Sequence, residues 1–325
     1  MAVFRLLHAS DLHFARVPRQ IGLPDLRHAW ASRVSGTWAP VSSHGPIYAD
    51  AFAAFVYANR NGLDAIFLSG DVATTGDPGD LRPAHRFLHA PAAAGYLSVK
   101  NRPTLQAANK PIVLLPGNHD RFGSFHLPGK TSFDKVFAQD WKARQGCQLL
   151  WMGQRRGAAL ALIGVDFSLR PRDAGSVYGG LPLLGFLGQG RIYAARLQRL
   201  RLLTRSVQQK YPGCTLLWGM HFEPSAADPS LALLDDHLLS QALQQERVAA
   251  ILCGHTHAGR IKDFAGTPVY VCGTTTQYAS VQGNHFHVLE IDIRPSAPAR
   301  LKLISFRYDP ASGQFIAETA AGRSP

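Results

Sequence analysis

The chain has 325 residues, 46% of them hydrophobic and 17% charged, with a formal net charge of +12. This composition excludes a disordered polypeptide and supplies enough apolar residues for a large core. No run reaches the roughly 18 apolar residues of a membrane span, and the apolar part of the N-terminus is too short for a signal peptide. We therefore expect a cytoplasmic protein without a transmembrane segment. The positive charge comes mostly from Arg and favours an anionic substrate or surface, with compositional bias as the alternative.

Short apolar runs that end in polar or glycine-containing turns recur along the chain, which is typical of strands buried on both faces. They cover residues 3–11, 64–71, 111–120, 158–166, 214–222 and 248–257. Between them, the apolar spacing predicts helices at residues 48–62, 191–210 and 229–247. The four cysteines are far apart and form no CxxC pair, so we expect reduced, buried thiols.

An alternating strand pattern begins after residue 265 and predicts C-terminal antiparallel strands over residues 266–310. Irregular segments near residues 14–47 and 167–190 follow strand ends, and we interpret them as insertions that shape a site or as ordinary packed loops. No linker divides the chain. We expect one domain over residues 1–325, with an α/β architecture of layered sheets covered by helices.

Polar side chains recur at the ends of the predicted strands, where a core would exclude them. They are Asp11, His13, Asp71, Asn118, His119, His221, His255 and His257. Residues at i and i+2 share one face of a strand, so each of the two motifs D-x-H and H-x-H should present its pair of side chains to one place. Carboxylate, imidazole and amide oxygen groups suit divalent Mn, Fe or Zn. The pattern predicts a metal site at the strand ends.

This ordered set resembles the calcineurin-like metallophosphoesterase superfamily, and its bacterial phosphodiesterase-like branch in particular. The family pattern D-x-H, G-D, G-N-H-[DE], H and G-H-x-H stands here at residues 11–13, 70–71, 117–120, 221 and 254–257. The resemblance implies a four-layer αββα sandwich, in which two mixed sheets are flanked by helices. It also implies two divalent or mixed-valence metal ions, of Mn, Fe or Zn, at the strand ends.

The resemblance further implies a role for each matching residue. Asp11, His13 and His257 would bind one metal, and Asn118, His221 and His255 the other, with Asp71 bridging them. The reaction would be in-line attack on phosphorus by a hydroxide held between the metals. His119 would serve as general acid or hydrogen-bond donor at the leaving-group oxygen. Apart from the resemblance, we expect Asp120 to support the turn or its surroundings.

Two departures from the family pattern affect the finer assignment. Many relatives carry Asp or Asn three residues after the bridging carboxylate, where it supports the histidine of the GNH motif, but Thr74 stands there in this chain. Asp77 and Asp120 are the alternative supports. At residues 221–224, HFEP replaces the His-Pro-Pro-like stretch of many cyclic-nucleotide relatives, which disfavours a cyclic-nucleotide substrate.

The predicted function is hydrolysis of a phosphate ester, most simply as a phosphodiesterase or pyrophosphatase on a small nucleotide-like substrate. One alternative is a lipid-linked phosphate or pyrophosphate at a membrane surface, which the apolar segment 179–190 and the basic charge would suit. Another is a nuclease, although the Arg residues form no aromatic-interleaved stripe. A metal-free scaffold on the same fold is the non-enzyme alternative, and it predicts lost ligand positions.

Further polar residues lie outside this pattern. His285 and His287 repeat the i, i+2 spacing, but we interpret them as neighbours on a sheet face rather than as a second metal site. Arg121 follows the GNHD motif and has two alternative roles, contact with substrate phosphate or a place on the surface.

Overall fold

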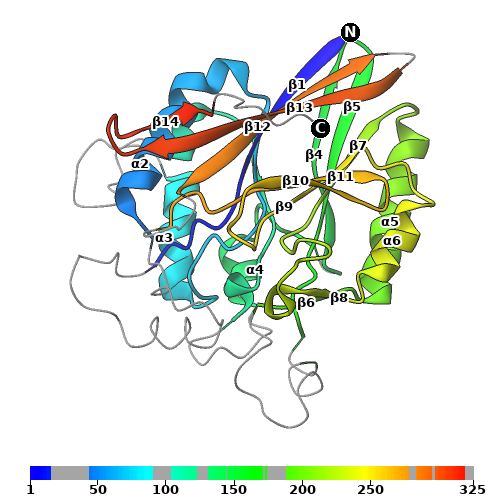
Figure 1. Cartoon of the computed structure of the whole chain (residues 1–325), viewed down its shortest axis with the longest axis horizontal. Helices are drawn as coiled ribbons and strands as arrows, with labels where there is room; N and C mark the ends of the chain where they lie inside the picture. The colour runs from blue at the N-terminus through cyan, green and yellow to red at the C-terminus, as the bar shows by residue number, and fades with distance from the viewer. Residues whose placement is uncertain are drawn as a thin grey trace.

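The computed structural model describes residues 1–15, 44–90, 104–122, 131–143, 145–170, 173, 188–277, 283–294 and 297–318. Most of the two predicted insertions, residues 16–43 and 174–187, lies outside the described residues. The described part forms two facing β-sheets with helices on the outer side of each sheet (Figure 1). The predicted layered α/β fold, with two mixed sheets flanked by helices, is confirmed.

The first sheet has six strands in the order β14-β13-β12-β1-β2-β3. Its first four strands pair antiparallel, whereas β1, β2 and β3 run parallel. The sheet is mixed because the C-terminal strands add to one edge of a parallel core. Its strands are β1 (Ala2–Ala9), β2 (Ala65–Leu68), β3 (Ile112–Leu114), β12 (His285–Arg294), β13 (Ala297–Asp309) and β14 (Gln314–Ala317).

The second sheet also has six strands, in the order β10-β11-β9-β7-β5-β4. Its four inner strands run parallel, and the two edge strands pair antiparallel with their neighbours. The strands are β4 (Cys147–Arg155), β5 (Ala158–Val165), β7 (Thr215–Gly219), β9 (Ala250–Cys253), β10 (Arg260–Phe264) and β11 (Thr267–Val271). Two short strands, β6 (Gly190–Arg191) and β8 (Leu233–Leu234), pair separately.

The C-terminal strands do not form the single antiparallel continuation expected over residues 266–310. β12 and β13 are antiparallel members of the first sheet, but β11 belongs to the second sheet and pairs parallel with β9. The strand pattern was recognisable from alternation, whereas the partner of each strand depends on contacts distant in sequence.

Helices cover the outer faces of both sheets (Figure 1). α2 and α3 pack on the first sheet, and α5 and α6 on the second. The helices are α2 (Pro46–Asn59), α3 (Pro78–His89), α4 (Ser132–Val136), α5 (Ala194–Lys210) and α6 (His237–Leu243). Short 3-10 turns are η1 (Arg60–Gly62), η3 (Leu105–Ala108), η4 (His119–Arg121) and η6 (Pro229–Leu231).

The predicted helix over residues 229–247 is broken in the structure. It begins with the η6 turn, whose first amide groups are capped by the Asp228 side chain, which accepts a hydrogen bond from Ser230 N. The chain then extends into β8, and Asp235 adopts a left-handed conformation with φ of 62°. Pairing of β8 with β6 therefore prevails over the helical periodicity, and only α6 remains helical.

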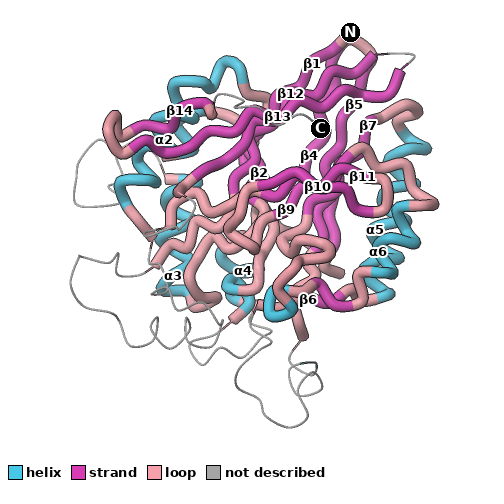
Figure 2. The backbone as a smooth tube through the Cα atoms, viewed as in Figure 1, coloured by secondary structure: helices cyan, strands magenta, loops and turns pink. Residues whose placement is uncertain are grey.

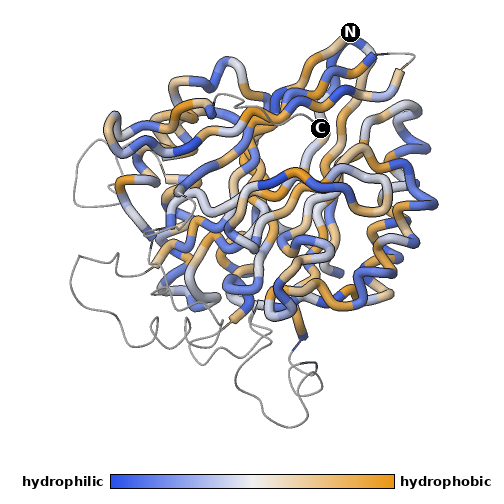
Figure 3. Tube along the Cα trace, in the orientation of Figure 1, coloured by the Kyte–Doolittle hydropathy of each residue, from blue (hydrophilic) through white to orange (hydrophobic). Residues whose placement is uncertain are grey.

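The core explains why the strand runs are apolar without interruption. In β7, Leu217 contributes to the core between the two sheets, while Trp218 contributes to the core beneath α5 and α6. Figure 3 shows hydrophobic residues running along these central strands. Cys272 contributes to the core between the two sheets, and Cys253 contributes to the core beneath α5 and α6. All four cysteines are free thiols.

Candidate metal centre

The predicted site residues lie in loops that follow parallel strands of both sheets. Asp11 and His13 follow β1, Asp71 follows β2, Asn118 and His119 follow β3, His221 follows β7, and His255 and His257 follow β9. Figure 2 shows loops gathered at this end of the strands. The carboxyl ends of the two sheets therefore bring residues from five separate motifs together.

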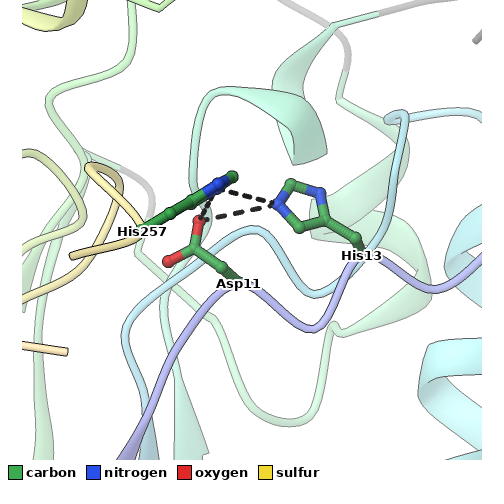
Figure 4. Close-up of side chains that lie close together, drawn as sticks. All are labelled: Asp11, His13 and His257. Atoms are coloured by element: carbon green, nitrogen blue, oxygen red, sulfur yellow. Dashed lines mark hydrogen bonds and ion pairs between the residues drawn. The ribbon is translucent and has the colours of Figure 1, made fainter. Parts of the chain in front are cut away.

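One group of side chains consists of Asp11, His13 and His257, whose ligand atoms lie within 4.8 Å of one another. His257 Nε2 lies 3.1 Å from Asp11 Oδ1, and the Nε2 atoms of His13 and His257 are 3.3 Å apart (Figure 4). The His257 side chain is 36% exposed. We call this group the open pocket.

A second group consists of Asp71, Asn118, His221 and His255, all buried. His221 Nε2 lies 3.2 Å from Asp71 Oδ2, 3.0 Å from Asn118 Oδ1 and 3.2 Å from His255 Nδ1. We call this group the closed pocket. The amide oxygen, a carboxylate oxygen and two ring nitrogens thus face one point.

Asp71 lies between the two pockets. It shares a cluster with His221 and His255 on one side, and a second cluster with His13 and His119 on the other. Burial opposes its ionisation, but the neighbouring histidines, with His221 foremost, hold the pKa of Asp71 below its usual value. The ionised carboxylate of Asp71 therefore lies beside His221 and His255 on one side and beside His13 and His119 on the other.

The donor sets fit two transition-metal ions. Ligands bound about 2.1 Å from one ion lie about 3 to 3.5 Å apart, the range found between the facing atoms of each pocket. Imidazole with carboxylate or amide oxygen is the donor chemistry of Mn, Fe and Zn sites. The described residues thus fit the two-metal site that the sequence predicts, without selecting among these metals.

Backbone carbonyl groups orient three of the imidazoles. His221 Nδ1 contacts Ser69 O at 2.8 Å, and His255 Nε2 contacts Gly188 O at 2.5 Å. A carbonyl only accepts, so each contacting nitrogen carries the proton and leaves the other nitrogen free to face the pocket. His255 consequently presents Nδ1, unlike His221, which presents Nε2.

The third oriented imidazole is His119, and the contact identifies its support. Its Nδ1 lies 2.8 Å from the carbonyl oxygen of Thr74. The Thr74 hydroxyl points elsewhere and donates to His13 O at 2.7 Å. The departure from the family pattern is thus met by the backbone of the substituted residue.

The motif loops are held in an unusual backbone conformation. Asp11, His13, Asp71, His255 and His257 have φ values of 55°, 50°, 51°, 75° and 55°. Left-handed backbone at non-glycine residues costs of order 1–3 kcal/mol each and persists only where surrounding contacts impose it. His255 and His257 lie in different pockets, so the expectation that H-x-H presents both side chains to one place is wrong, whereas Asp11 and His13 do share a pocket.

Two motif glycines are required by close approach. A Cβ at Gly117 would lie 2.1 Å from Asp71 Oδ1, and a Cβ at Gly254 would lie 1.9 Å from Ser10 Oγ. Any side chain at these positions would displace the loops that carry the pocket residues.

Asp120 serves the turn rather than either pocket. Its carboxylate accepts hydrogen bonds from the backbone N–H groups of Val72, Ala73 and Gly117 at 2.9 to 3.2 Å. Burial, followed by the charge of Asp71, raises the pKa of Asp120 to about 7. These contacts fasten the GNHD turn to the loop after β2.

Arg121 is buried and forms ion pairs with two aspartates, so the alternative that it lies on the surface is wrong. Its guanidinium donates to Asp134 at 2.7 and 2.9 Å and to Asp166 at 3.0 Å. Asp166 was missed by the sequence analysis, although it ends an apolar strand in the same way as Asp71. The ion pair between Arg121 and Asp166 anchors the GNHD turn to the loop after β5.

Both histidines of β12, His285 and His287, are buried within the fold. His287 Nε2 contacts Val271 O, and its Nδ1 contacts Ser305 Oγ, both at 3.1 Å. His285 contacts the backbone N–H of Gly273 at 2.9 Å. Both residues lie on β12, and their ring centroids are 5.5 Å apart.

Comparison with known proteins now defines the family. The model of the calcineurin-like phosphoesterase family matches residues 4–259 of the 325-residue chain. The chain belongs to this family and is, at that level, a metal-dependent phosphoesterase. None of the curated proteins matches it significantly. Within the part of the chain that the structure describes, no helix is both long and apolar enough to cross a membrane.

Solved structures share the fold at low sequence identity. A dimetal phosphatase from Danio rerio is 13% identical, with a TM-score of 0.56 over 94% of this chain and 99% of that one. GAP50, the anchor in the inner membrane complex of Plasmodium, is 13% identical, with a TM-score of 0.54 over 97% and 87%. A putative 5'-nucleotidase from Staphylococcus aureus is 11% identical, with a TM-score of 0.53 over 93% and 53%. These likenesses establish the fold alone.

Proposed function

We propose that this protein is a two-metal phosphodiesterase or pyrophosphatase that hydrolyses a small, nucleotide-like substrate. The observation that carries the proposal is the position of Asp71, one buried carboxylate shared by clusters on either side. Two cations held close together require an anionic bridge, and Asp71 offers one oxygen toward His221 and the other toward the His119 backbone.

In this proposal the open pocket holds one metal and the closed pocket the other, with Asp71 shared. Two bound metals would supply Lewis acidity and a hydroxide nucleophile near neutral pH. The chain's own contribution is to fix the donors beforehand, through the carbonyl contacts of His221 and His255 and the buried packing of Asn118. Binding then requires little rearrangement of the closed pocket.

His119 is the proposed general acid. Its Nδ1–H donates to Thr74 O, which directs Nε2 toward the side where His13 and Asp71 lie. His119 is partly exposed, and its ring lies 4.9 Å from that of His13 in an edge-on arrangement. From this position the doubly protonated imidazolium would donate its Nε2 proton to the leaving-group oxygen as the bond to phosphorus breaks, and Nδ1–H would stay on Thr74 O.

The charges beside the motifs favour a monoanionic diester over a dianionic monoester. The basic side chains that follow the GNHD and GHTH motifs are already paired, Arg121 with two aspartates, and Arg260 and Lys262 with Glu223. A monoester dianion would gain from a bidentate Arg contact that these residues do not offer.

The test is a turnover comparison in Mn²⁺ between a bis-aryl phosphate and the matching aryl monophosphate. We expect kcat/KM to favour the diester by at least about tenfold, or about 1.4 kcal/mol of transition-state stabilisation. A preference for the monoester would contradict the proposed substrate class. Cyclic nucleotides, nucleotide diphosphates, lipid-linked sugar nucleotides and single-stranded DNA, assayed in parallel, separate the nucleotide proposal from the membrane and nuclease alternatives.

A further inference from the structure

Glu223 is a fully buried carboxylate that lies outside both pockets. It accepts hydrogen bonds from Arg260 Nε at 2.9 Å and Nη2 at 2.5 Å, from Lys262 Nζ at 2.9 Å, and from Thr256 Oγ1 at 2.7 Å. The side chain is 0% exposed. A buried charge is tolerated only when paired and hydrogen-bonded, and here both oxygens of the carboxylate are engaged.

These contacts join three segments at one end of the second sheet. Glu223 lies two residues after His221 in the loop following β7, and Thr256 lies in the GHTH motif after β9. Arg260 and Lys262 belong to the edge strand β10. Lys262 Nζ also donates to the carbonyl of Pro224, the residue after Glu223, at 2.5 Å. One carboxylate therefore connects the His221 loop to the loop that carries the other two histidines.

The position of Thr256 gives this connection its significance. It stands between His255 and His257, which have left-handed φ values of 75° and 55°. The two histidines diverge, with His255 in the closed pocket and His257 in the open pocket. A strained backbone of this kind relaxes unless neighbouring contacts impose it. The Thr256 hydroxyl supplies one such contact, midway between the two diverging side chains.

We propose that Glu223 and Thr256 are positioning residues that set the divergence of His255 and His257 and thereby tune metal binding in both pockets. Glu223 belongs to no metal-compatible cluster of the described residues, and the Thr256 hydroxyl donates to Glu223, so both act through the histidines. The proposal rests on the two-metal centre of the proposed function. A cross-link that serves stability alone is the alternative, and it predicts a loss of melting temperature without a change at the metals.

The test compares Thr256→Val with Thr256→Ser in the metal-depleted 325-residue protein. Valine keeps the size and β-branching of threonine but removes the hydroxyl, and serine restores the hydroxyl without the methyl group. Thr267→Val is the matched control, a buried threonine at the start of β11 whose side chain makes no hydrogen bond within the described part of the chain. Each protein is titrated with Co²⁺, and the visible absorption of the bound metal reports its geometry.

We expect Thr256→Val to bind Co²⁺ about 10- to 100-fold more weakly, the usual effect of removing a group that orients metal ligands, with an altered visible spectrum. Thr256→Ser and Thr267→Val should match the wild type in both measurements. Glu223→Gln removes the charge of the carboxylate that accepts the hydrogen bond from the Thr256 hydroxyl. This variant should shift the spectrum in the same direction as Thr256→Val.

Two outcomes would overturn the inference separately from the proposed function. Wild-type affinity and spectrum in Thr256→Val, or no recovery in Thr256→Ser, would refute the positioning role while leaving the metal centre intact. Failure of the wild type to bind Co²⁺ would instead refute the metal centre, and the inference with it.

Discussion

The open and closed pockets use the same donor chemistry but are built differently. In the closed pocket, His221 and His255 each have the outer ring nitrogen bonded to a backbone carbonyl, at 2.8 and 2.5 Å. In the open pocket, His13 Nδ1 is buried and has no hydrogen-bond partner among the described residues, and the His257 side chain is 36% exposed. The imidazoles of the closed pocket are therefore held in place by the protein without a metal, whereas those of the open pocket lack such backbone contacts within the described part of the chain.

This difference separates two tasks within one centre. A pocket whose ligands are already oriented binds metal with little loss of side-chain freedom, so it should hold the more persistent ion. A pocket with an exposed ligand offers a place where substrate can reach the centre. His119, packed against His13, lies on that open side. We therefore expect metal retention to depend on the closed pocket, and the chemical step to take place at the open one.

Asp71→Asn should give the largest effect, because it removes the charge shared by both pockets. The amide keeps the size of the carboxylate and can still accept from His119 N–H, but it cannot offset two cations. We expect kcat/KM to fall by more than about 10³-fold, equivalent to at least about 4 kcal/mol. Turnover in Mn²⁺ together with metal content measures this, and near-wild-type turnover would remove Asp71 from its bridging role.

His119→Ala should affect the chemical step while sparing the metals. General-acid catalysis contributes typically about 10²- to 10⁴-fold, and mainly when the leaving group is a poor one. We expect that loss for an alkyl ester and a much smaller loss for a nitrophenyl ester, with metal content unchanged. An equal loss for both esters would contradict a proton-donating role on the open side.

The comparison of the pockets is sharpened by His221→Gln and His257→Gln, measured for metal affinity. The wild type should bind Co²⁺ in two steps that differ by about tenfold or more, because only one pocket has its imidazoles fixed by carbonyl groups. His257→Gln should preserve the tighter step, and His221→Gln should lose it. If His257→Gln were the variant that lost the tighter step, the assignment of the two pockets would be reversed.

Much of the site was predictable because its donors follow strand ends in a fixed order. Carboxylates and imidazoles after apolar runs are recognisable in the sequence, and parallel strands bring their carboxyl ends to one edge. The partners of these donors were not predictable. The Thr74 and Gly188 contacts involve backbone oxygens, which every residue has, so no residue type in the sequence marks them.

The errors share a physical cause. The strand alternation rule failed at GHTH because His255 and His257 lie in a loop beyond the end of β9, not on a strand. The helix over residues 229–247 was interrupted by pairing of β8 with β6. Glu223 was visible only as a departure from a family pattern, since its partners lie 33 to 39 positions away. Local sequence specifies elements well, whereas contacts between distant segments decide their ends.

His287 is a buried histidine outside both pockets, so its protonation tests the stability of the fold and not the metal centre. Burial, reinforced by His285, lowers the pKa of His287 to about 3 in the folded protein, against about 6.5 in an unfolded chain. The folded state therefore binds fewer protons, and the stability contributed by neutral His287 is complete above pH 6.5 and declines as the pH falls toward 3. At pH 5 the decline should amount to about 2 kcal/mol.

The measurement compares the wild type with His287→Gln by urea unfolding of the metal-depleted proteins at pH 7.5 and pH 5. The variant should be the less stable at pH 7.5, since glutamine fits the contacts with Val271 and Ser305 less well. Its free energy of unfolding should then fall by about 2 kcal/mol less than that of the wild type on acidification. Parallel losses would show that protonation of His287 is not coupled to folding, and that acid sensitivity arises in the pocket histidines instead.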